Sequence, residues 1–137
     1  MAEQTLTPGT IVVTASDAMT DAGAVFRIDP ETGAPIKVAS GGTLATPMGV
    51  AIDGEGAILV ADADAFGGSG GVIRVDPLSG VQTTVSSGGL FSNPFDLTVD
   101  GTGNILVADP HASGVGGVIR VDPATGEQTM VSSGEEP

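Results

Sequence analysis

The sequence predicts an all-β fold made of three similar units, and three observations lead to this prediction. First, the chain is 40% hydrophobic but contains no Trp, no Tyr and only four Phe, so its core must consist of Val, Ile, Leu and Ala. Second, 22 Gly and nine Pro interrupt the apolar runs, which indicates tight turns between short strands rather than long helices. Third, the chain of 137 residues repeats itself. Ile11, Ile58 and Ile105 are each 47 residues apart, and the intervals between Asp29, Asp76 and Asp122 are 47 and 46 residues.

Each unit is expected to contain four strands. The first, at residues 48–54 and 95–101, alternates apolar and polar positions, which is typical of a half-buried strand, and it closes with an Asp-Gly turn. The second, at residues 57–62 and 104–109, is a continuous apolar run, which indicates burial on both faces. In the first unit this second strand corresponds to residues 10–15.

The third and fourth strands are joined by a repeated pentapeptide. The third strand covers residues 24–30, 71–77 and 117–123, and the fourth, at residues 81–87, alternates Val with Gln and Thr like a partly solvated edge strand. Between them lie DPETG, DPLSG and DPATG. Asp at the first position, Pro at the second and Gly at the last describe a type I turn completed by a glycine, so we interpret each copy as a structural hairpin.

Four-stranded units of about 40–50 residues with short turns are typical of the blades of a β-propeller. The three blades are expected at about residues 1–40, 48–87 and 95–134 of one repeat domain that covers residues 1–137. The first blade leaves two alternatives open. Residues 1–9 have the length of its missing inner strand, or they form a loose arm and leave this blade one strand short.

At this point the chain resembles a known group of propellers, the NHL and streptogramin-lyase-like group. The segment PFDLTVDGTGNILVADPHASGVGGVIRVDP, residues 94–123, matches most of the pattern PxGIAVDxxGNIYVADxxxxxIxxxDP that the group carries in each blade. The resemblance extends over the whole chain and implies the propeller fold. It is weak for function, because the group includes both binding scaffolds and enzymes.

Three blades are too few to close a ring, because propellers typically contain about four to eight. A chain of three blades leaves two apolar sheet faces uncovered, so we expect self-association. Two chains would give a six-bladed ring with a two-fold axis along its channel, which satisfies the preference of oligomers for closed symmetry. The predicted partner is therefore a second copy of the chain, in a homodimer.

Acidic loop residues provide the candidate site. Asp62 and Asp109 end the second strand of their blades, and Asp17, Asp64 and His111 align with one another in the loops beyond it. These residue types suit a divalent cation such as Ca²⁺. The alternative, which we favour, is structural: Asp62 and Asp109 accept hydrogen bonds from loop N–H groups, and the other three are solvated.

Charge and motifs exclude several function classes. A net charge of −13, from 17 acidic and four basic residues, argues against nucleic acid and anionic membranes as partners. No targeting segment and no apolar run of about 18 residues is present, so the chain as given is predicted to be soluble, and its compartment is unknown. Catalytic sequence motifs are absent, and we assign no catalytic residue. The repeated Arg27, Arg74 and Arg120 are interpreted as structural partners of nearby Asp residues.

The function predicted from these features is a self-assembling half-propeller that acts as a binding or structural scaffold. The alternative is a metal-dependent hydrolase or lyase in which Asp62, Asp64, Asp109 and His111 hold the ion and activate water at the acidic central mouth. Enzymes that resemble this fold use clusters of His, Glu or Asn to hold a metal, whereas this chain has one His and no Glu in the loops concerned. Whether the protein is an enzyme stays open.

Overall fold

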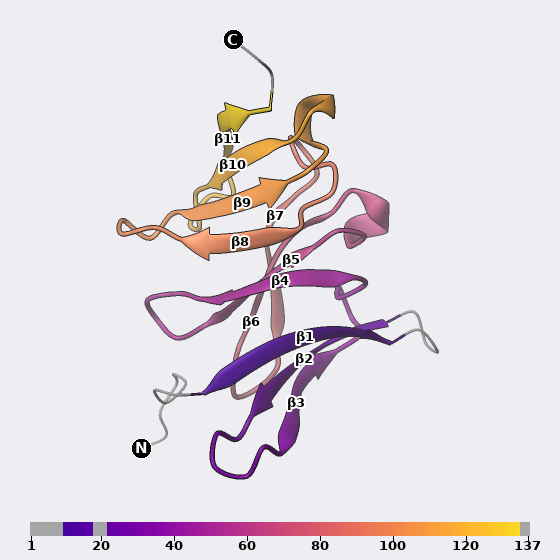
Figure 1. Ribbon diagram of the computed structural model, residues 1–137, viewed down its shortest axis with the longest axis vertical. Helices are drawn as coiled ribbons and strands as arrows, with labels where there is room; N and C mark the ends of the chain where they lie inside the picture. Colours follow the sequence, from indigo (N-terminus) through magenta and orange to yellow (C-terminus); the bar gives the residue numbers. More distant parts are fainter. Residues whose placement is uncertain (1–9, 18–21, 135–137) are drawn as a thin grey trace.

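Three antiparallel sheets are stacked along the long axis of the molecule (Figure 1). The computed structural model describes residues 10–17 and 22–134. The first sheet contains β1 (Ile11–Asp17), β2 (Ala22–Ile28) and β3 (Pro35–Ser40) in sequential order. The second contains β4 (Pro47–Ile52), β5 (Ile58–Asp62), β6 (Gly71–Val75) and β7 (Gln82–Ser87), and the third β8 (Asp96–Val99), β9 (Ile105–Asp109), β10 (Gly117–Val121) and β11 (Gln128–Ser133). The predicted all-β class and the four-stranded second and third units are confirmed.

Helical structure in the described residues is limited to two single turns. These are the 3₁₀ turns η1 (Phe66–Gly68) and η2 (Ala112–Gly114), which occupy equivalent loops of the second and third units. No helix in residues 10–17 and 22–134 is long and apolar enough to cross a membrane.

The repeated pentapeptides form the predicted corners, which join the last two strands of each sheet. In the second sheet the Asp76 carboxylate accepts hydrogen bonds from the N–H groups of Leu78 and Ser79, at 2.8 and 2.9 Å. The Gly80 N–H donates to the Asp76 carbonyl at 2.9 Å, and the φ of Gly80 is +77°, in the left-handed region that glycine adopts without steric cost. The other two corners have the same bonds, so turn chemistry explains why the pentapeptide recurs.

The predicted Asp-Gly turns begin at the expected residue but use a different glycine. Asp53 directly follows the first strand of the second sheet, and its carboxylate accepts hydrogen bonds from the N–H groups of Glu55 and Ala57. The residue with positive φ is Gly56, at +85°, and not Gly54. The connection is therefore a wider Asp-Gly-x-Gly turn held by the Asp side chain, and the third sheet repeats it from Asp100 to Gly103.

Two apolar layers hold the three sheets together, and β5 contributes to both. Ile58 and Val60 of β5 pack toward the first sheet, against Val25, and Leu59 and Ala61 pack toward the third. All of β5 is buried, as the sequence predicts. In β9 the same run is buried on one face, while Leu106 is half-buried and Ala108 is exposed. The difference arises because β5 lies in the middle sheet and β9 in an end sheet.

The first sheet has three strands in the described residues. Its strand β1 lies beside β4, which in turn lies beside β8, along one side of the stack (Figure 1). The prediction that residues 1–9 complete the first blade falls outside the described residues.

Candidate functional site

The loops at one end of the sheets carry the predicted site residues, and two of these residues anchor the loops. Asp109, which is 1% exposed, accepts hydrogen bonds from the backbone N–H groups of Ser92, Asn93 and His111 at 2.8–3.0 Å. Asp62, which is fully buried, has the same arrangement in the second sheet. In each case two bonds reach back to the connector that enters the sheet from the preceding unit. The predicted structural role of both carboxylates is confirmed.

The other predicted residues lie around these anchors without forming a cluster. The side chains of Asp64 and His111 are exposed, each two residues beyond its anchoring Asp. Asp17 is the last residue of β1, and its side chain falls outside what the structure describes. In the described part of the chain, no three His, Cys, Asp or Glu side chains come close enough together to hold a metal ion. A cation site built from these five residues stays a prediction.

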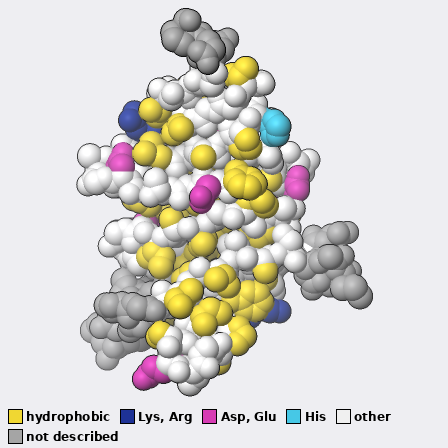
Figure 2. All heavy atoms as spheres, viewed as in Figure 1, with side chains coloured by type: hydrophobic (Ala, Val, Ile, Leu, Met, Phe, Trp, Pro, Cys, Tyr) yellow, Lys and Arg dark blue, Asp and Glu magenta, His cyan; other side chains and the backbone are white. Residues whose placement is uncertain are grey.

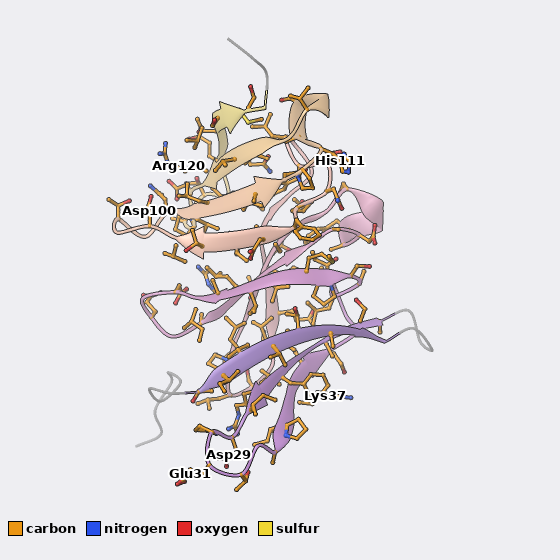
Figure 3. All side chains as sticks on the ribbon, viewed as in Figure 1. Asp29, Glu31, Lys37, Asp100, His111 and Arg120 are labelled. Atoms are coloured by element: carbon orange, nitrogen blue, oxygen red, sulfur yellow. The ribbon has the colours of Figure 1, made fainter. Side chains whose placement is uncertain are left out.

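A shallow hollow lies beside His111. It has a volume of about 560 Å³, and its lining residues are Asn93, Phe95, Ala108, Asp109, Pro110, His111 and Gly117. Phe95 contributes an aromatic ring that is 49% exposed. Figure 3 places His111 at the opposite end of the third sheet from Asp100 and Arg120. The hollow therefore belongs to the end where the anchored loops lie.

Carboxylates at the other turns are held in their charged form by hydrogen bonds. The N–H groups of Glu31 and Thr32 lower the pKa of Asp29, and those of Ser79 and Leu78 lower the pKa of Asp76. The Thr102 hydroxyl and N–H lower the pKa of Asp100. These residues stabilise turns and carry no sign of a catalytic role.

The repeated arginines behave as predicted in one case. Nε of Arg74 lies 3.6 Å from Oδ2 of Asp53 in the same sheet. Among the described residues this is the one ion pair within 4.0 Å, and Arg120 acts on Asp100 only through a longer-range contribution that lowers its pKa. An ion pair of this length with a partly exposed Arg contributes little stability.

Two glutamines join neighbouring units, and sequence reasoning missed them. The Gln82 amide accepts a hydrogen bond from the Thr43 N–H and donates to the Gly41 carbonyl, at 2.8 and 3.1 Å. The equivalent Gln128 accepts from the Leu90 N–H and donates to the Gly88 carbonyl and to the Ser86 hydroxyl. Each glutamine thus holds the connector that enters its own sheet. Their equal offset after the Asp-Pro corners was the available signal.

The first sheet carries an apolar face that no other described sheet covers. We define the upstream face of a sheet as the face turned toward the preceding unit. On the first sheet it consists of Ile11 and Val13, which are 50% and 38% exposed, and of Phe26 and Ile28, directly opposite them in register. Figure 2 shows hydrophobic side chains gathered over this part of the molecule. Equivalent residues of the second sheet, Ile58, Val60, Ile73 and Val75, are fully buried.

A second uncovered face lies on the third sheet. The downstream face, turned toward the following unit, carries Leu106, Ala108 and Val118, which line a shallow hollow of about 280 Å³. Their equivalents in the second sheet are Leu59, Ala61 and Val72, each at most 1% exposed because the third sheet covers them. The first and third sheets, at opposite ends of the stack, therefore each carry an apolar face that no other described sheet covers.

Comparison with known proteins identifies the fold. No protein-family model matches the sequence, and no curated protein matches it. Among solved structures, TolB from Acinetobacter baumannii has a TM-score of 0.68 at 16% identity, over 91% of this chain and 30% of that one. A putative 6-phosphogluconolactonase from Bacteroides fragilis has a TM-score of 0.51 at 16% identity, over 87% of this chain and 37% of that one.

The chain has a propeller-like fold. It spans about a third of the length of each of these two structures. Sequence identities this low support the same fold but indicate no activity, because proteins with one fold can have many functions. The resemblance to the NHL and streptogramin-lyase-like group stays a prediction.

Proposed function

We propose that the protein is a half-propeller that assembles with a second copy of itself into a six-bladed ring, which acts as a binding or structural scaffold. The observation that carries this proposal is the match between the two uncovered faces and the two buried junctions. Inside the chain, a downstream face of Leu, Ala and Val packs on an upstream face of Ile and Val. On its second and third strands the third sheet repeats the downstream face with identical residues, Leu106, Ala108 and Val118. On its first strand, Asp96 and Thr98 stand where the second sheet has Gly49 and Ala51.

The uncovered upstream face is equally close to its buried counterparts. Ile11 and Val13 stand where the second and third sheets also have Ile and Val, and Phe26 and Ile28 replace an Ile and a Val. Burial of such side chains is the main driving force of association. In a dimer each copy would present one face of each kind, so both faces of both copies would be covered and no sheet would stay open.

Assembly would also give the loops at the His111 end a common location. The loops of both copies would surround one opening of the ring, which doubles the set of exposed Asp64 and His111 side chains there. Loops carried on a rigid sheet scaffold are the usual location of binding residues. The proposal therefore places ligand recognition, if the scaffold binds a ligand, at this end of the ring.

The mass of the protein in solution tests the proposal. We expect light scattering on a size-exclusion column to give twice the chain mass of 13.4 kDa. The refractive index should serve as the concentration signal, because a chain without Trp and Tyr absorbs little at 280 nm. A folded monomer at every concentration from about 1 to 100 µM, the range in which a moderate interface dissociates, would refute the proposal.

A matched pair of variants tests whether dimerisation uses the upstream face of the first sheet. Val13→Asp places a charge in the upstream face of the first sheet, and Val81→Asp places the same charge on a valine that is 60% exposed and lies on neither face. We expect the first variant to be a monomer with an unchanged far-UV spectrum and the second to stay a dimer. Equal masses for the two variants would show that association uses another surface.

Salt provides a second readout. Each copy carries a net charge of −13, so two copies repel one another at low ionic strength. Added salt screens this repulsion over about 10 Å at 0.1 M and leaves apolar burial in place. We therefore expect the dimer to strengthen with NaCl. An interface made by ion pairs would weaken instead.

A further inference from the structure

The two junctions inside the chain share a contact that fixes their register. At each junction the corner glycine of one sheet lies against the outer strand of the preceding sheet. A Cβ on Gly126 would lie 2.5 Å from the carbonyl oxygen of Val85 in β7, and a Cβ on Gly80 would overlap the carbonyl oxygen of Val38 in β3. Any side chain at these glycines would therefore push the two sheets apart.

The first and third sheets each contain one residue that is equivalent to a partner in this contact but does not make the contact within the chain. Gly33, the corner glycine of the first sheet, has a φ of +77°, as at the other corners, but no atom of the described residues lies within 4 Å of the position of its Cβ. Val131 of β11, nine residues after its corner Asp like Val38 and Val85, is 46% exposed. A third junction of the same geometry would bring these two residues together.

The first sheet also lacks both residues that hold an incoming connector. Ala15 occupies the position of the anchors Asp62 and Asp109, and Pro35 occupies the position of Gln82 and Gln128. Neither side chain can accept or donate a hydrogen bond. The upstream face of the first sheet thus keeps the apolar surface of a junction without the groups that hold a connector there. A junction between two separate chains needs the apolar surface and has no such connector to hold.

We propose that the upstream face of the first sheet receives the downstream face of the third sheet of a second copy, head to tail, in the register of the internal junctions. Gly33 then lies against the carbonyl group of the partner's Val131. This inference rests on the proposed function and adds the polarity and the register of its interface. In the separate chain only the positive φ of Gly33 favours glycine, whereas in the dimer the contact also leaves no room for a side chain there.

Substitution of Gly33 by Asn tests the register. Asn adopts the left-handed region more readily than other side chains, so the corner itself tolerates it. Gly67→Asn is the matched control, because Gly67 has a φ of +75° and, among residues 10–17 and 22–134, no neighbour within 4 Å of its Cβ position. It lies in η1, away from both uncovered faces. We expect Gly67→Asn to dimerise like the wild type and Gly33→Asn to raise the dimer dissociation constant at least about tenfold.

Thermal unfolding of dilute samples, in which the chains are separate, controls for a folding defect. Gly33→Asn and Gly67→Asn should then melt at similar temperatures. If Gly33→Asn dimerises as tightly as Gly67→Asn, the proposed register is wrong while self-association stands. If the wild type is a monomer, the proposed function fails and this inference fails with it.

Mixing two blocked chains tests the polarity. Val13→Asp blocks the upstream face of the first sheet, and Leu106→Asp blocks the downstream face of the third. Head-to-tail association predicts that each variant alone is a monomer and that an equimolar mixture forms a heterodimer, since one pair of unblocked faces remains. Association between two first sheets predicts instead that Leu106→Asp dimerises alone. That result would overturn the inference without affecting self-association.

Discussion

Replacement of Asp109 by Ala should destabilise the protein by about 3 kcal/mol or more. The substitution removes a buried carboxylate that accepts hydrogen bonds from three backbone N–H groups, those of Ser92, Asn93 and His111. A hydrogen bond to a charged group contributes about 1.5–3 kcal/mol, and a buried donor left without an acceptor costs about 1–3 kcal/mol. Because Ser92 and His111 are exposed, water can replace part of what is lost. We therefore expect a loss of about 3 kcal/mol, which is less than the sum of three such hydrogen bonds.

Urea unfolding followed by far-UV circular dichroism measures this loss, because the chain has no Trp or Tyr for fluorescence. With a denaturant slope of about 2 kcal/mol per M, 3 kcal/mol shifts the midpoint by about 1.5 M at unchanged slope. Asp64→Ala is the matched control, since Asp64 is exposed in the equivalent loop of the second sheet. Protein concentration must be equal in all samples, because association adds to apparent stability. If the midpoint of Asp109→Ala lies within about 0.25 M of this control, the anchoring role is refuted.

Three further predictions address the junctions, the corners and the candidate cation site. Gln128→Ala should lower the free energy of unfolding by about 2 kcal/mol and Gln82→Ala by about 1 kcal/mol, as measured by urea unfolding. The reason is that the Gln128 amide makes three hydrogen bonds to the preceding unit or its connector, whereas the Gln82 amide makes two. Equal losses would contradict this order. Asp76→Asn should lower stability at neutral pH and should match the wild type only when the pH is below the lowered pKa that Asp76 has in the folded protein. Because the pKa of Asp76 is lower in the folded than in the unfolded protein, its charge stabilises the fold at a pH above the unfolded-state pKa, and this contribution is lost as the pH falls through the folded-state pKa. A difference in stability that does not depend on pH would show that the charge plays no part. Added Ca²⁺ or EDTA should leave the melting temperature unchanged, because the oxygens of the two buried carboxylates already accept backbone hydrogen bonds; a rise with Ca²⁺ would instead favour the metal site.

Local features of the chain were predictable because each depends on residues close together in the sequence. The Asp76 corner is held by N–H groups two to four residues away, so the pentapeptide alone specifies it. The role of Asp62 and Asp109 as hydrogen-bond acceptors follows in the same way, since an Asp directly after a buried strand commonly binds loop N–H groups. The glycine of the Asp-Gly turn was misplaced, because either Gly54 or Gly56 could provide the positive φ.

Contacts between residues far apart in the sequence could not be predicted from the pattern of a single repeat. The connector bonds of Asp109 reach 16 and 17 residues back, and those of Gln128 reach about 40 residues back, so neither pairing can be read from local pattern. The sequence also predicts burial of both faces for β5 and β9 alike, since their apolar runs are nearly identical. The structure separates them, because only β5 has a sheet on each side.

By itself, the sequence determined the number of units, their strands and their corners, because turn preferences and apolar periodicity act within a few residues. The tertiary structure decided which apolar residues stay uncovered, because burial depends on the neighbour that a sheet acquires and not on the residue itself. Val13 and Val60 occupy the same position in their units, yet one is 38% exposed and the other is fully buried. That contrast locates the uncovered face of the first sheet, and it follows from the stacking order of the three sheets.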